Sequence, residues 1–177
     1  MIVKVLFSGA GGQGVLTMGN VLANAAMLEN FFVTYLPAYG AAMRGGTANC
    51  TVSISDVEIA SPVASSPDMV VAMNHPSALN FMNRLQPGGQ LFYNASLINN
   101  LPYRGDIEVS SLPANDLARS LKNERSANMV MLGYFVKTAK IIKLKTIMKS
   151  LEVLMESKPK LVEASQKAVN LGYKYKD

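Results

Sequence analysis

The feature that most constrains the fold of this chain is the glycine-rich segment Gly9 to Gly14, which reads Gly-Ala-Gly-Gly-Gln-Gly. An apolar run from Ile2 to Phe7 precedes it, and a helical pattern over residues 13–29 follows it. Its first, third and last glycines have the Gly-x-Gly-x-x-Gly spacing of a tight strand-to-helix turn. The N–H groups at the start of such a helix favour a bound anion. Glycines that only let the chain turn and pack would show the same spacing, so both interpretations stay open.

A dinucleotide site would also need an acidic residue about 20 residues further on, at the end of the second strand. The second predicted strand covers residues 31–36, runs into Pro37 and carries no acid. Glu29 falls in the last turn of the preceding helix. The sequence therefore predicts that no nicotinamide or flavin dinucleotide binds here.

Strand and helix patterns alternate along the chain. The run from Met69 to Met73 is continuously apolar, as in a strand buried on both faces. Residues 47–55 alternate as a strand, and we expect Ser55-Asp56 to turn it into a short return through Val57 and Ile59, which makes one β-hairpin. Further strands are predicted at 91–93 and 107–109, and helices at about 77–85, 114–121, 126–139, 144–156 and 159–171. This order predicts an α/β fold: a mostly parallel sheet with helices on both faces and a helical C-terminal part.

The length of 177 residues suits one domain, 1–177, with a well-buried core. The one cysteine, Cys50, excludes an internal disulfide framework and any multi-cysteine zinc or iron-sulfur site, and it suits the cytoplasm. The apolar N-terminal run is interrupted by Lys4 and ends at the glycines, so it is too short for a signal peptide or a membrane span. We therefore expect no membrane association.

Charge is distributed unevenly. Residues 1–100 hold three basic and four acidic groups, a net of −1, whereas residues 101–177 hold 14 basic and 8 acidic groups, a net of +6. Seven charges are too few for the solvated surface of a hundred residues, so we expect another chain to cover much of this half. The isolated chain should then self-associate. The basic half interleaves lysines with acids at helical spacing and lacks aromatic stacking residues, so no nucleic-acid binding is expected.

The sequence shows no catalytic apparatus. His75 is the one histidine and precedes Pro76 at a predicted strand end, but no serine, cysteine or carboxylate is placed as its partner. Cys50 lies on the apolar side of its strand, where a small buried residue is the ordinary interpretation. No metal-ligand spacing occurs, so the chain is expected to present a binding surface.

Several motifs together resemble a known family. They are, in order, Phe7 to Val15, Tyr39-Gly40-Ala41-Ala42-Met43-Arg44-Gly45-Gly46, the strand Thr47 to Ser55, Ser61-Pro62, Pro67-Asp68, Leu85-Gln86-Pro87-Gly88-Gly89, and Ala127 to Gly133. In this order they resemble the gamma subunit of 2-oxoacid:ferredoxin oxidoreductases of the pyruvate, 2-oxoglutarate or 2-ketoisovalerate type. The match spans most of the chain.

The resemblance implies a non-catalytic subunit of an enzyme complex that oxidatively decarboxylates a 2-oxoacid to an acyl-coenzyme A and is inactive alone. Thiamine diphosphate and iron-sulfur clusters would lie on partner subunits. The partners would be alpha and beta subunits, with a delta or ferredoxin-like subunit as a further candidate. Ferredoxin would interact with this chain only by way of the complex. This chain would bind no cofactor alone but would lend two glycine loops to coenzyme A. The residues so predicted are Gly9, Gly11, Gly12, Gln13, Gly14, Arg44, Gly45 and Gly46.

An independent nucleotide- or anion-binding α/β domain is the alternative hypothesis. It would need no alpha or beta partner, so co-purification separates the two.

Overall fold

Six strands form one sheet in the computed structural model, which describes residues 1–39, 46–61 and 66–176. They are β1 (Ile2–Ala10), β2 (Phe32–Tyr39), β3 (Thr47–Ser55), β4 (Met69–Ala72), β5 (Gln90–Asn94) and β6 (Glu108–Leu112), in the spatial order β2-β3-β1-β4-β5-β6. Strands β1, β4, β5 and β6 pair in parallel, whereas β3 pairs antiparallel with both β1 and β2. The predicted α/β fold class is confirmed.

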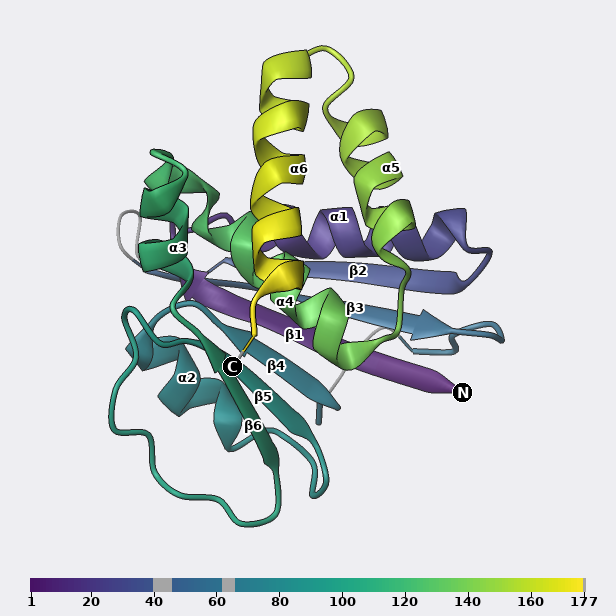
Figure 1. Cartoon of the computed structure of the whole chain (residues 1–177). Coiled ribbons are helices and arrows are strands. Elements are labelled where there is room, and N and C mark those ends of the chain that lie inside the picture. Colours follow the sequence, from purple (N-terminus) through teal and green to yellow (C-terminus); the bar gives the residue numbers. More distant parts are fainter. Residues whose placement is uncertain (40–45, 62–65, 177) are drawn as a thin grey trace.

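Helices cover both faces of this sheet (Figure 1). They are α1 (Val15–Leu28), α2 (His75–Met82), α3 (Ala114–Ser120), α4 (Ala127–Ala139), α5 (Leu144–Leu154) and α6 (Pro159–Lys174), with a 3-10 turn, η1 (Glu124–Ser126), before α4. Successive residues of β1 point to opposite faces. Val5 and Phe7 join the larger core under α1 and α4, and Leu6 joins a smaller core under α2. Helices α5 and α6 lie on the same side of the sheet as α1 and α4.

The predicted return strand through Val57 and Ile59 is wrong, because residues 56–61 form bends and irregular structure. Strand β3 is flanked by β1 on one side and β2 on the other, so neither of its edges is free for a return strand. The consecutive antiparallel strands are instead β2 and β3, with Phe32 opposite Ser55 and Tyr39 opposite Ala48.

Strand β2 also continues through Pro37, where we expected it to stop. A proline cannot donate to a sheet ladder, and it is tolerated in an edge strand because one side of that strand needs no donor. Strand β2 is the outermost strand of the sheet. Its edge position therefore explains why the strand extends to Tyr39.

Helix α4 is held between the sheet and α6 by two kinds of contact. On the sheet side, the Phe135 ring meets the rings of Phe7 and Phe92 edge-on, with centroids 5.7 and 5.1 Å apart. On the α6 side the backbones approach closely at Gly133 and Gly172. A Cβ added at Gly172 would lie 1.8 Å from the Val130 carbonyl oxygen, and one at Gly133 would lie 2.0 Å from that of Val169.

Gly172→Ala should therefore destabilise the protein, because the added methyl group meets rigid backbone and forces α6 away from α4. We expect the free energy of unfolding to fall by roughly 1 to 3 kcal/mol, as for other overpacked cores. Urea unfolding followed by circular dichroism measures this as a lower midpoint at unchanged slope. Gly11→Ala is the matched control, since within the described part of the chain its Cβ meets only the Gly46 carbonyl oxygen, 3.8 Å away. Equal stability of the two variants would contradict the close-packing account.

Candidate functional site

The turn between β1 and α1 requires glycine at several positions. Gly12 and Gly14 have φ values of +93° and +72°, in the left-handed region that favours glycine. A Cβ at Gly9 would lie 2.7 Å from Gln13 Oε1 and 2.9 Å from Val15 Cγ1. The glycines therefore serve the tight turn and close packing that their spacing predicts.

The N-terminus of α1 lacks a side-chain cap. Its N-cap residue is Gly14, and no acidic residue lies in the first turn. Gly11 donates its N–H to the Gly46 carbonyl (3.0 Å), and Gln13 donates to the Ala10 carbonyl (3.1 Å). Within the described part of the chain, the N–H groups of residues 15–17 have no hydrogen-bond acceptor. Unpaired N–H groups and the helix dipole together favour an anion at this helix end.

The side chain of Gln13 holds the loop in place. Its Oε1 accepts a hydrogen bond from the Ala10 N–H (2.7 Å), and its Nε2 donates to the Met73 carbonyl (3.3 Å). Gln13 was predicted among the ligand-binding residues. Both of its amide atoms already bond to backbone, so the side chain braces the loop against the end of β4.

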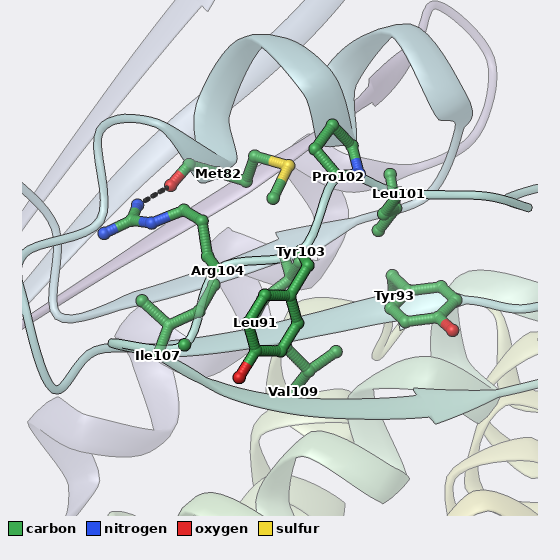
Figure 2. A pocket seen from close by; sticks show the side chains of 10 residues that line it. Met82, Leu91, Tyr93, Leu101, Pro102, Tyr103, Arg104, Ile107 and Val109 are labelled. Carbon is green, nitrogen blue, oxygen red and sulfur yellow. Dashed lines mark hydrogen bonds between the residues drawn. The ribbon is translucent and has the colours of Figure 1, made fainter.

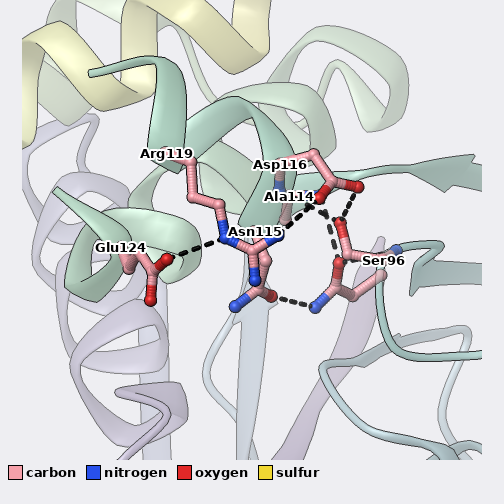
Figure 3. A network of polar contacts seen from close by, with 7 residues as sticks. Ser96, Ala114, Asn115, Asp116, Arg119 and Glu124 are labelled. Atoms are coloured by element: carbon pink, nitrogen blue, oxygen red, sulfur yellow. Dashed lines mark hydrogen bonds and ion pairs between the residues drawn. The ribbon is translucent and has the colours of Figure 1, made fainter. Parts of the chain in front are cut away.

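Asn94 also hydrogen-bonds to the Met73 carbonyl, and its side chain is fully buried. Its Nδ2 donates to the Met73 carbonyl (3.3 Å) and to Asn115 Oδ1 (2.7 Å), and its Oδ1 accepts from the Ala114 N–H (3.1 Å). This network ties the carboxyl ends of β4 and β5 to the start of α3 (Figure 3). The sequence reasoning missed Asn94; its position at a strand end was the available signal.

Charged groups extend the network along α3. The Ser96 hydroxyl donates to Asp116 (2.9 Å), and the Arg119 guanidinium pairs with Asp116 (2.9 Å) and with Glu124 (2.7 Å), as Figure 3 shows. The neighbouring Glu124 carboxylate raises the pKa of Arg119. These pairs are exposed, so they orient α3 and η1 and contribute little to stability.

A cleft of about 240 Å³ lies between the glycine turn and the α3–α4 connection. We call it the glycine-loop cleft, and its lining residues are Gly12, Gln13, Met73, Asn115, Glu124, Arg125, Ala127 and Asn128. Asn128 is buried and donates from Nδ2 to the Gly14 carbonyl (3.2 Å). A Cβ at Gly14 would lie 2.3 Å from that nitrogen, so this contact also requires glycine.

Arg125 supplies a positive charge to the glycine-loop cleft. It is exposed, and no ion pair to it is formed by the residues that the structure describes. Arg125 and Asn128 also line a second hollow of about 290 Å³, with Thr17, Met129, Met155 and Leu161 among its walls. The two hollows therefore meet at Arg125, one beside the glycine turn and the other reaching apolar side chains of α4 and α6.

The structure brings some of the predicted site residues together. Gly9, Gly11, Gly12, Gln13 and Gly14 lie in one turn, and the Gly11 to Gly46 hydrogen bond joins this turn to the residue before β3. Arg44 and Gly45 lie outside the described residues. A binding role for all eight stays a prediction. Asn115, Arg125 and Asn128, which also line the cleft, were not predicted, because they are more than a hundred residues away in the chain.

The other candidates of the sequence have structural positions. His75 begins α2, whose N-cap is Asn74. Glu29 accepts hydrogen bonds from the Lys143 N–H (3.0 Å) and the Thr146 hydroxyl (2.6 Å). It therefore joins the C-terminal end of α1 to α5, at the opposite end of α1 from the glycine turn. Among the residues that the structure describes, no three potential metal ligands gather, and no helix is both long and apolar enough to span a bilayer.

The interpretation of Cys50 as a buried packing residue is confirmed. Its side chain is fully buried, and burial raises its pKa from 9.0 to about 12, so the thiol stays protonated at neutral pH. Its sulfur lies where α1 approaches β3 most closely, since a Cβ at Gly19 would be 2.3 Å from it.

We expect native Cys50 to react with a thiol reagent such as dithiobis-nitrobenzoate only as fast as the protein opens, because a buried neutral thiol is not nucleophilic. In denaturant one thiol per chain should react at once. The raised folded-state pKa means that this group's contribution to stability is complete below pH 9 and is lost as the pH rises toward 12. Rapid labelling of the native protein at pH 7 would contradict this account.

The site is thus an α/β strand-to-helix turn with an uncapped helix N-terminus, in the class of folds that bind ligands at the carboxyl ends of parallel strands. The family model described as "Pyruvate ferredoxin/flavodoxin oxidoreductase" matches residues 4–175. The chain belongs to this family.

Two relatives that resemble this chain differ in length. The chain is 40% identical over 131 residues to ketoisovalerate oxidoreductase subunit VorA of Methanothermobacter thermautotrophicus, covering 74% of this chain and 27% of that protein. It is 32% identical over 146 residues to 2-oxoglutarate synthase subunit KorC of Methanothermobacter marburgensis, covering 78% of each. The chain therefore spans about a quarter of the length of the first relative and most of the second.

Solved structures confirm the fold. The gamma subunit of a keto/oxoacid ferredoxin oxidoreductase from Geobacter sulfurreducens has a TM-score of 0.82 at 27% identity, with 97% of this chain and 96% of that chain covered. The 2-oxoglutarate:ferredoxin oxidoreductase from Magnetococcus marinus, solved with 2-oxoglutarate, coenzyme A and succinyl-CoA bound, has a TM-score of 0.87 at 21% identity. There the match covers 97% of this chain and 30% of that chain. These comparisons favour the gamma-subunit interpretation and give the independent nucleotide-binding domain no support.

Proposed function

We propose that this chain is the gamma subunit of a cytoplasmic 2-oxoacid:ferredoxin oxidoreductase. In that complex a 2-oxoacid is oxidatively decarboxylated to an acyl-coenzyme A, with thiamine diphosphate, iron-sulfur clusters and the electron transfer to ferredoxin on other subunits. Family membership carries this proposal. The described residues agree with it, because the N–H groups at the start of α1 favour a bound anion.

Alpha and beta subunits are the proposed partners, with a delta or ferredoxin-like subunit as a further candidate. In VorA, this unit makes up 27% of the protein, so further polypeptide accompanies it on the same chain. KorC, which this chain matches over 78% of both lengths, is named as a subunit of a 2-oxoglutarate synthase. We therefore expect this chain to purify with alpha and beta subunits from its native cell.

The proposed role of the glycine-loop cleft is to hold the phosphates of coenzyme A. The N–H groups at the start of α1, which have no acceptor among the described residues, and the guanidinium of Arg125 supply positive potential, while the Glu124 carboxylate in the same lining is paired with Arg119. The adjoining hollow, with Met129, Met155 and Leu161, suits a less polar part of the same ligand. Coenzyme A is named in the structure from Magnetococcus marinus, and its position on this chain is our proposal. Arg44, Gly45 and Gly46 belong to this proposal as the second loop.

The chain by itself should show no 2-oxoacid oxidation when thiamine diphosphate, coenzyme A and an electron acceptor are supplied, because the chemistry resides on its partners. The measurement is reduction of a viologen dye by the purified chain, compared with the complex isolated from the native cell. Turnover by the chain alone would contradict the proposal.

Gly11→Asp tests the proposed anion site within the complex. Among the described residues, a Cβ at Gly11 meets only the Gly46 carbonyl oxygen, 3.8 Å away, so they leave room for the side chain. A carboxylate about 6 Å from a phosphate would repel it by roughly 3 kcal/mol at an effective dielectric of about 20. A loss of about 1.4 kcal/mol in binding free energy lowers the affinity tenfold. We therefore expect the Michaelis constant for coenzyme A to rise by at least about tenfold, while the constant for the 2-oxoacid is unchanged.

Gly11→Asn is the matched control for this variant, because it has the same shape without the charge. We expect its Michaelis constant for coenzyme A to stay within about threefold of the wild type, which corresponds to a change of about 0.6 kcal/mol in binding free energy. If Asp and Asn have equal effects, the glycine turn acts through its shape and the phosphate assignment is wrong.

A further inference from the structure

Strand β6 leaves one row of backbone groups unused. In a parallel ladder each residue directs its N–H and C=O to the same side, and this side alternates along the strand. The Glu108 N–H donates to the Gly89 carbonyl (2.9 Å) and the Leu112 carbonyl accepts from the Ala95 N–H (2.9 Å), so alternate residues from 108 to 112 face β5. Val109 and Ser111 therefore direct their N–H and C=O outward, where the described chain has no further strand.

An apolar groove lies beside this edge. Its volume is about 460 Å³, and Met82, Leu91, Tyr93, Leu101, Ile107 and Val109 are among its lining residues. Figure 2 shows their side chains gathered around the space between β5, β6 and residues 101–105. Val109 is 54% exposed and Tyr103, at the rim, is 92% exposed. An exposed valine on an edge strand beside an apolar groove is a surface that proteins ordinarily cover.

The wall of the groove opposite β6 is anchored in place. The Arg104 guanidinium donates to the carbonyls of Met82 and Leu85 and pairs with Asp106. Glu108, the one other charge on this edge, accepts a hydrogen bond from Gln90 (2.7 Å). Arg104, the charged residue in the groove lining, is therefore neutralised by Asp106, so the lining itself is preformed and close to neutral, whereas Glu108 keeps its negative charge at the start of β6.

We propose that the β6 edge binds an extended, apolar segment of a partner subunit, which adds to the sheet as a further strand and inserts apolar side chains into the groove. Only an extended polypeptide uses both features at once, since its backbone pairs with Val109 and Ser111 while its alternate side chains reach the groove. The neutral lining selects an uncharged segment. This inference rests on the proposed function, which supplies the partner subunits.

A second copy of this chain fits the edge less well. If two copies paired β6 over its full length about a two-fold axis at Ser110, Val109 of each copy would lie opposite Ser111 of the other. A serine side chain cannot fill an apolar groove of 460 Å³. The opposite edge of the sheet, β2, contains Pro37, which cannot donate a hydrogen bond to an added strand.

Hydrogen exchange at single residues tests the proposal. In the isolated chain the N–H groups of Val109 and Ser111 should exchange rapidly, whereas that of Ser110, bonded to β5, should be protected. In the complex purified with its partner subunits, exchange at Val109 and Ser111 should slow at least about a hundredfold, with Ser110 as the internal reference. A complex that forms with both outward groups still exchanging rapidly overturns the inference and leaves the proposed function standing.

Ser111→Pro removes one outward N–H and leaves the β5 ladder intact, and Ser111→Ala is its control because the N–H is kept. We expect the proline variant to bind the partner subunits at least about tenfold more weakly and the alanine variant within about threefold. If the proline variant does not fold, Val109→Asp replaces it, since this exposed side chain borders the groove. Equal binding by all variants overturns the proposal.

Two further outcomes have distinct meanings. Protection at Val109 and Ser111 that rises with concentration in the isolated chain identifies a second copy as the occupant and overturns the assignment to a partner. Failure of the wild-type chain to assemble with alpha and beta subunits overturns the proposed function, and the inference that rests on it falls too.

Discussion

The carbonyl of Met73 is the point that fixes the geometry of the candidate site. Gln13 and Asn94 both donate amide hydrogens to it, one from the glycine turn and one from the end of β5. A buried amide without a partner costs free energy, so both side chains are held in one arrangement. Because Asn94 also bonds to the start of α3, the two walls of the glycine-loop cleft are positioned by the same oxygen.

This arrangement agrees with the proposed role of the glycine-loop cleft as a binding site for an anion. Its described polar groups include backbone N–H groups, amide side chains and the Arg125 guanidinium, which favour a negative charge, and the Glu124 carboxylate, which is paired with Arg119. The buried thiol of Cys50 is kept protonated and packed under α1. Under the proposed function, the subunit would hold a phosphorylated ligand for catalytic groups on other chains.

The two edges of the sheet differ in a way that fits an assembled protein. Strand β2 carries a proline, which limits the pairing of another strand. Strand β6 has no such protection, and its outward groups lie beside a preformed apolar groove. Prolines and charges commonly protect edge strands, and β6 has only the charge of Glu108 at its first residue, which agrees with the proposed pairing at Val109 and Ser111.

The sequence by itself determined the fold class, the turn at Gly9 to Gly14, the helical C-terminal part and the burial of Cys50, because these follow from short-range periodicity and residue type. It misplaced the hairpin, since only the strand order shows that β3 has neighbours on both sides. Tertiary structure alone decided that Asn115, Arg125 and Asn128 line the cleft beside the glycine turn. Their convergence depends on how α3 and α4 pack over the ends of the strands, which is a long-range consequence of burial that local spacing does not encode.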